Sequence, residues 1–168
     1  MSTDKPFIIS RVFDASRETV WRAWTDVEQM KQWWGPKGAV ISYAKMDLKK
    51  GGTYLYCMNF MGTEMWGKFV FTEIKKPEKL AFINSFSDKD ANITRHPFAE
   101  TWPLETETVV NFVEKSGKTE VTVNWVPHNA SEAEKKTFNE GHASMQQGWT
   151  GTFDGFAQYL AGKAKLAS

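Results

Sequence analysis

The sequence has little of what marks several large classes of protein. Its 168 residues include one cysteine, Cys57, which excludes an internal disulfide and fits a reducing compartment. No run of about 18 apolar residues occurs, so the sequence predicts no membrane-spanning helix. Residues 1–7 (MSTDKPF) carry no apolar signal-peptide segment. We therefore expect a soluble, cytoplasmic protein.

An excess of charge of either sign is also missing. Lys and Arg together number 21, and Asp and Glu together number 20. The chain has no dense run of Lys and Arg of the kind that binds phosphate backbones. The sequence therefore predicts no nucleic-acid partner.

Motifs for metal binding and for catalysis are absent as well. The three histidines and Cys57 do not follow a ligand spacing such as H-x₃₋₅-H or C-x₂-C, so we predict no metal site. No nucleophile elbow, phosphate-binding loop or dinucleotide fingerprint occurs, and we predict no cofactor. Nothing in the sequence gives a positive signal for catalysis.

Aromatic residues, by contrast, are abundant. The chain holds 8 Trp and 12 Phe, and such large rigid side chains either fill a core or line an apolar pocket. A chain of this length is expected to form one domain, spanning residues 1–168, with a substantial core.

The order of patterns along the chain predicts an α+β fold. A β-branched and aromatic strand comes first, followed by two short helices that Ser16 and Asp26 begin and Trp33–Pro36 ends. Ser87–Pro103 is a long irregular stretch, and Ser131–Glu134 is a capping box that leads into a final helix. The predicted strands are Phe7–Phe13, Ala39–Asp47, Thr53–Phe60, Glu64–Ile74, Leu80–Phe86, Thr106–Val113 and Thr119–Val126, the last ended by Pro127.

The final helix, Gly141–Lys163, has three faces when its residues are placed at about 100° intervals. One face is an apolar stripe, made of His142, Met145, Trp149, Phe153, Phe156 and Leu160. The opposite face is polar, made of Gln147, Thr150, Asp154, Gln158 and Lys165.

A row of glycines runs between these faces. Gly141, Gly148, Gly155 and Gly162 are seven residues apart, with Gly151 beside them. Each glycine costs a helix roughly 1 kcal/mol relative to alanine, so tertiary packing must compensate. We favour close approach of a neighbouring element as the reason, and the alternative is that the missing side chains help to form a cavity.

Four phrases along the chain resemble the signatures of a known family. The first is residues 13–36, FDASRETVWRAWTDVEQMKQWWGP, and the second is residues 47–54, DLKKGGTY. The third joins Gly67 to FTEI at 71–74 and PEKL at 77–80. The fourth lies in the final helix, at Met145, Gln147, Gly148, Trp149 and Leu160.

These phrases are similar to those of the family named after the activator of heat-shock-protein-90 ATPase, within the SRPBCC or START-like superfamily. The resemblance implies a helix-grip fold: a curved antiparallel sheet wrapped around a long C-terminal helix, with two short helices after the first strand. It also implies a cavity between sheet and helix. Relatives include lipid carriers, hormone receptors and cyclases, so fold alone does not give the function.

Our functional hypothesis is non-catalytic binding of a small hydrophobic or aromatic molecule in that cavity. His142 lies on the apolar stripe, either as a core histidine with one partner or as the polar contact of the pocket. Two alternatives remain: a stress-response role in which the domain binds a chaperone or another protein, and a hydrolase or cyclase that uses His142 as an acid or base. The candidate ligand-binding residues are Trp34, Trp66, Trp102, His142, Met145, Trp149 and Phe153.

Overall fold

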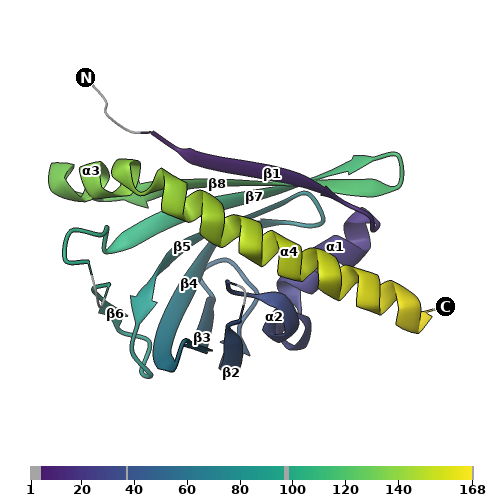
Figure 1. The fold of residues 1–168 in the computed structure, drawn as a ribbon, viewed down its shortest axis with the longest axis horizontal. Helices are drawn as coiled ribbons and strands as arrows, with labels where there is room; N and C mark the ends of the chain where they lie inside the picture. Colours follow the sequence, from purple (N-terminus) through teal and green to yellow (C-terminus); the bar gives the residue numbers. More distant parts are fainter. Residues whose placement is uncertain (1–4, 37, 97–98, 168) are drawn as a thin grey trace.

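The computed structural model describes residues 5–36, 38–96 and 99–167, with side chains up to Gly162. Figure 1 shows a single curved sheet with the long last helix lying across it. In chain order the elements are β1 (Phe7–Phe13), α1 (Arg17–Thr25), α2 (Val27–Trp33), β2 (Val40–Met46), β3 (Thr53–Phe60), β4 (Thr63–Lys75), β5 (Lys79–Ser87), β6 (Ile93–Thr94), β7 (Glu105–Lys115), β8 (Lys118–His128), α3 (Glu132–Glu140) and α4 (His142–Ala167).

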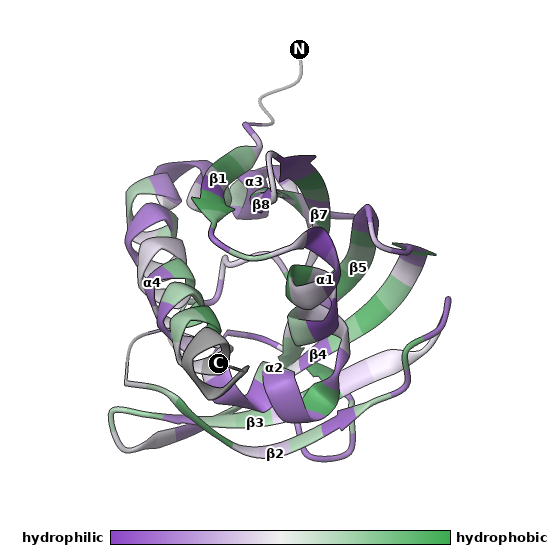
Figure 2. Ribbon diagram, turned by 90° about the vertical axis from the view of Figure 1, so that its right-hand side faces the viewer, coloured by the Kyte–Doolittle hydropathy of each residue, from purple (hydrophilic) through white to green (hydrophobic). Residues whose placement is uncertain are grey.

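The sheet has the strand order β1-β8-β7-β5-β4-β3-β2, with β6 paired to β5 off this path. Every described pair is antiparallel. The register shifts between Ile41 and Tyr43 and between Phe71 and Glu73, and such irregularities increase local twist. In Figure 2 the sheet curls from β1 round to β2 while α4 closes the remaining side. The helix-grip expectation is thus confirmed.

The predicted caps fix where the helices begin. The Ser16 hydroxyl accepts a hydrogen bond from the Thr19 N–H at 3.2 Å and begins α1. Asp26 accepts from the Glu28 N–H at 3.0 Å and begins α2 directly afterwards. Ser131 begins α3 with the complete capping box that the sequence predicts. These contacts satisfy backbone donors that a helix N-terminus leaves free.

Aromatic side chains dominate the core between the sheet and the helices. Trp24 is fully buried against Trp33, with ring centroids 4.8 Å apart, and Trp33 lies 4.3 Å from Phe156 of α4. The Trp33 indole N–H donates to the Ala23 carbonyl at 3.0 Å, so its polar atom is satisfied. These aromatic side chains therefore serve packing.

The apolar stripe of α4 divides into two parts. Phe153, Phe156 and Leu160 are buried in the core, as predicted, and Gln147, Asp154 and Gln158 are exposed on the opposite side. His142 and Trp149 are only partly buried. The second half of the helix therefore makes most of its core contacts, and in the first half Met145 is the buried member of the stripe. The polar-face prediction for Lys165 falls outside the described side chains.

Three details differ from the sequence prediction. The long stretch 87–103 contains the short strand β6, and α4 extends beyond Lys163 to Ala167. β8 also continues past Pro127 to His128, paired with β7. β1 pairs with β8 only as far as Trp125. At Pro127, β8 is therefore paired on one side alone, with β7, among the described residues. A proline is tolerated where a strand has one open side.

Candidate ligand-binding cavity

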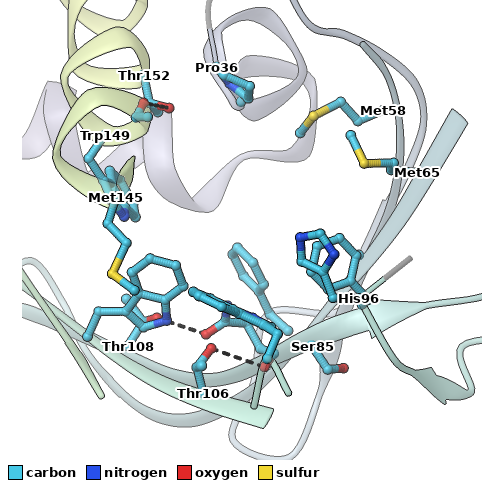
Figure 3. A pocket seen from close by; sticks show the side chains of 18 of the residues that line it. Pro36, Met58, Met65, Ser85, His96, Thr106, Thr108, Met145, Trp149 and Thr152 are labelled. Atoms are coloured by element: carbon cyan, nitrogen blue, oxygen red, sulfur yellow. Dashed lines mark hydrogen bonds between the residues drawn. The ribbon is translucent and has the colours of Figure 1, made fainter. Parts of the chain in front are cut away.

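A cavity of about 620 Å³ lies between the inner face of the sheet and the first half of α4. β3, β4, β5 and β7 form its floor and one wall, and further walls come from the Trp34–Pro36 turn and from the described residues His96, Trp102 and Pro103. Figure 3 shows Met145 and Trp149 of α4 on one side and Met58 and Met65 of the β3–β4 hairpin on the other.

The lining is mostly aromatic and thioether groups. Three methionines from three different elements face the space, and this unbranched side chain adapts its shape to different neighbours. Among the described lining residues none is Asp, Glu, Lys or Arg. The large apolar lining residues are Trp34, Tyr56, Met58, Phe60, Met65, Trp66, Phe69, Phe82, Phe86, Trp102, Trp125, Met145 and Trp149.

Gly67 shapes one wall by leaving room for a ring. A Cβ added to Gly67 would lie 2.4 Å from the Tyr56 ring on the neighbouring strand, closer than two such atoms can approach. The Tyr56 ring therefore lies across the β4 backbone and contacts Trp34, with ring centroids 6.2 Å apart. Burial raises the pKa of Tyr56, so its hydroxyl stays protonated and this wall uncharged at neutral pH.

Close packing, which we favoured from the sequence, does not explain Gly148 and Gly162 of the α4 glycine row. A Cβ added to Gly148 or Gly162 would meet nothing within 4 Å, and one at Gly155 only the Trp33 carbonyl oxygen at 3.8 Å. Gly141 and Gly148 line the cavity, which supports the alternative considered from the sequence. At these positions glycine lowers the helix propensity of α4 and leaves open the space that a side chain would otherwise fill.

Polar groups are few and lie mainly on β5 and β7. The Thr108 hydroxyl donates to Asn84 Oδ1 at 2.8 Å, and the Thr106 hydroxyl donates to the Asn84 backbone carbonyl at 3.3 Å. Dashed lines in Figure 3 mark these bonds along the cavity floor. Two further threonines, Thr137 and Thr152, donate their hydroxyls to backbone carbonyls one turn earlier in their own helices.

His96 brings the one imidazole to the described lining. It comes from the segment between β6 and β7, and its ring lies 4.7 Å from Phe86 and 6.1 Å from Trp102. Burial lowers the pKa of His96 below its ordinary value of 6.5, which favours the neutral imidazole.

The structure brings five of the seven predicted ligand-binding residues to the cavity. Trp34, Trp102, Met145 and Trp149 line it. Trp66 also lines it, while its indole N–H donates to Glu64 at 3.1 Å and its ring lies 5.4 Å from Tyr43.

His142 and Phe153 lie outside the described lining. His142 packs edge-on against Phe7 and Phe138, with ring centroids 5.8 and 5.5 Å away, because the first turn of α4 presents it to β1 and α3. Its Nε2 atom is buried and has no hydrogen-bond partner among the described residues. Phe153 is fully buried beside Phe13 at 5.3 Å.

Two sequence signals could have found the residues that were missed. The cavity-facing side of α4 is a second helical stripe, adjacent to the apolar one and mostly small: Gly141, Ser144, Met145, Gly148, Trp149 and Thr152. In β7 the inward positions change from Phe112 and Val110 to Thr108 and Thr106. That change from apolar to polar marks where the strand leaves the core and enters the cavity.

The described residues hold no group of three or more His, Cys, Asp or Glu side chains that could bind a metal ion. In the part of the chain that the structure describes, no helix is long and apolar enough to cross a membrane. Thr106 and Thr108, two polar residues of the described lining, carry neutral hydroxyls.

Solved structures share this architecture over nearly the full chain. A protein from Nitrosomonas europaea is 21% identical with a TM-score of 0.74, covering 98% of this chain and 99% of its own. One from Arthrobacter aurescens is 26% identical with a TM-score of 0.74, covering 93% and 86%. The AHSA1 protein from Silicibacter pomeroyi is 19% identical with a TM-score of 0.71, covering 95% and 99%.

Curated proteins give no match to this sequence. The model of one family, however, matches residues 14–161, which is most of the chain and includes every element from α1 to the core-packed part of α4. The chain therefore belongs to the family of Activator of Hsp90 ATPase homolog 1-like proteins.

Proposed function

We propose that this protein binds a small hydrophobic or aromatic molecule, without catalysis, in the cavity between the sheet and α4. The observation that carries the proposal is the cavity itself, about 620 Å³ with an aromatic and methionine lining. Small-molecule sites are typically apolar clefts of roughly 300–1,000 Å³ with a few polar groups. A planar ligand would lie between Trp34 and Trp149 on one side and the flexible Met58 and Met65 on the other.

The alternatives from the sequence are less well supported. An acid or base at His142 would have to reach a substrate, yet this side chain packs against Phe7 and Phe138 away from the described lining. General acid–base catalysis requires hydrogen-bond reach to the reacting group. The chaperone-associated role stays a prediction that rests on the family alone.

Native mass spectrometry of freshly purified protein tests the proposal. We expect a retained molecule on the wild-type chain. Gly148→Leu should abolish retention, because its side chain would enter the cavity where a Cβ meets nothing within 4 Å. Gly162→Leu is the matched control, since it adds the same side chain to an exposed part of α4 outside the described lining. Equal retention by both variants would contradict binding in this cavity.

A further inference from the structure

Asn84, Thr106 and Thr108 form a polar cluster on the cavity floor, and the side-chain amide of Asn84 is a donor that the cluster does not use. Asn84 stands opposite Thr106 in the β5–β7 register, on the inward face that also carries Phe82. The two threonine hydroxyls donate to the two carbonyl oxygens of Asn84, one in its side chain and one in its backbone. No hydrogen bond within the described chain engages Asn84 Nδ2, and that amide group carries two N–H donors.

Burial decides which member of the cluster meets a ligand. Thr106 and Thr108 are each 2% exposed, whereas Asn84 is only partly buried and lines the cavity. The bond from Thr108 at 2.8 Å fixes the orientation of the amide, because it holds Oδ1 toward β7. Nδ2 on the other branch of the amide is therefore the accessible polar atom, and Thr108 acts as a positioning residue.

The remaining lining restricts the charge of the ligand. With no Lys or Arg among the described lining residues, a carboxylate would lose its hydration without gaining a cationic partner. The flat rings of Trp34, Phe69 and Trp149 favour a planar molecule. An acceptor oxygen on such a molecule would accept a hydrogen bond from the Asn84 amide.

We propose that Asn84 determines specificity in this cavity by donating a hydrogen bond from its amide to the acceptor oxygen of an uncharged planar aromatic ligand. This inference rests on the proposed function and names its ligand class: aryl ketones and related aromatic carbonyl compounds. Thr108 orients the amide, and the threonines of α3 and α4 take no part because their hydroxyls are bonded to their own helices.

Three related aromatic probes test this directly. 9-Fluorenone carries a carbonyl group where fluorene has a methylene group, and fluorene-9-carboxylate carries a negative charge. Titrations followed by tryptophan fluorescence should show that the wild-type chain prefers fluorenone. Asn84→Leu should weaken fluorenone binding by roughly 3- to 10-fold, the factor that one neutral hydrogen bond supplies, and leave fluorene within about twofold. The carboxylate should bind most weakly to both.

Matched variants separate recognition from folding. Thr108→Val should reduce the preference for fluorenone, whereas Thr119→Val, a buried threonine outside the described lining whose hydroxyl donates to the Ala15 carbonyl at 2.8 Å, should leave it unchanged. If Asn84→Leu leaves the Thr108 hydroxyl unpaired and unfolds the chain, the double variant Asn84→Leu/Thr108→Val removes both partners and restores folding.

The outcomes are distinguishable. Fluorene binding without a preference for fluorenone, an equal loss of both probes in Asn84→Leu, or tightest binding of the carboxylate would each overturn the role of Asn84 and leave the proposed function standing. Failure of all three probes to bind the wild-type chain would overturn the proposed function as well.

Discussion

Tyr56 and Gly67 show at the scale of single residues how the cavity wall is made. The ring needs the space above a glycine, because a Cβ at Gly67 would lie 2.4 Å from it. Gly67→Ala should therefore force the ring toward the cavity and destabilise the fold by about 1–3 kcal/mol, the usual cost of overpacking. Denaturant melts would measure the loss. A variant as stable as the wild type would show that Tyr56 can leave its place freely.

His96 is the residue through which pH should act on stability. Burial lowers its pKa below 6.5 in the folded chain, so the unfolded chain takes up a proton first. Stability should fall as the pH drops from about 6.5 toward the folded-state pKa and then level off. His96→Phe keeps a ring beside Phe86 and should flatten this part of the profile.

Thermal midpoints between pH 7.5 and 5 provide the measurement. Carboxyl groups whose pKa the structure lowers, including Glu73, Asp88 and Glu134, titrate below this window and do not obscure it. If wild type and His96→Phe show the same pH dependence, the burial of His96 does not govern it.

At the scale of elements, the two halves of α4 have different surroundings. Its second half packs Phe156 against Trp33, and its first half covers the cavity. Since a Cβ at Gly148 meets nothing within 4 Å, Gly148→Ala should gain helix propensity without a clash. We expect up to about 1 kcal/mol of stabilisation, or roughly 2–4 °C in thermal midpoint. A lower midpoint would restore the close-packing explanation.

The described part of the segment between β6 and β7 is tied to α3 by polar contacts. Arg95 forms an ion pair with Glu134, and the Thr101 and Thr137 hydroxyls lie 2.7 Å apart. The backbone N–H of Ser131 and then Arg95 lower the pKa of Glu134. Arg95→Met should cost under about 1 kcal/mol globally, because the pair is largely exposed on the arginine side, yet release this segment locally.

Hydrogen exchange of the Trp102 amide, which bonds to the Ala99 carbonyl at 3.1 Å, would report that release. Lys136→Met serves as the control, because Lys136 pairs with Glu140 within α3 at 4.0 Å and does not reach the segment. Equal exchange in both variants would mean that the Arg95 pair does not hold the segment in place.

At the scale of the whole molecule, the sequence predicted the fold better than the site. Caps, strand patterns and the stripe of α4 are local signals, and Ser16, Asp26 and Ser131 begin helices as expected. The cavity depends on where the sheet curls away from α4, and the small residues of α4 and the polar positions of β7 indicate this place only once the two elements are known to face each other. His142 therefore lies on the same stripe as Met145 and Trp149 but packs against Phe7 instead of lining the cavity. The sequence patterns did not point to Asn84, which does line it.

The central claim is that the space beneath the first half of α4 is a ligand site. Titration of fluorene against wild type, Gly148→Leu and Gly162→Leu tests it most directly, because both variants gain the same side chain on the same helix. We expect Gly148→Leu to weaken binding by at least about tenfold, because its side chain fills the cavity, and Gly162→Leu to bind like wild type. Equal affinities in all three proteins would contradict it.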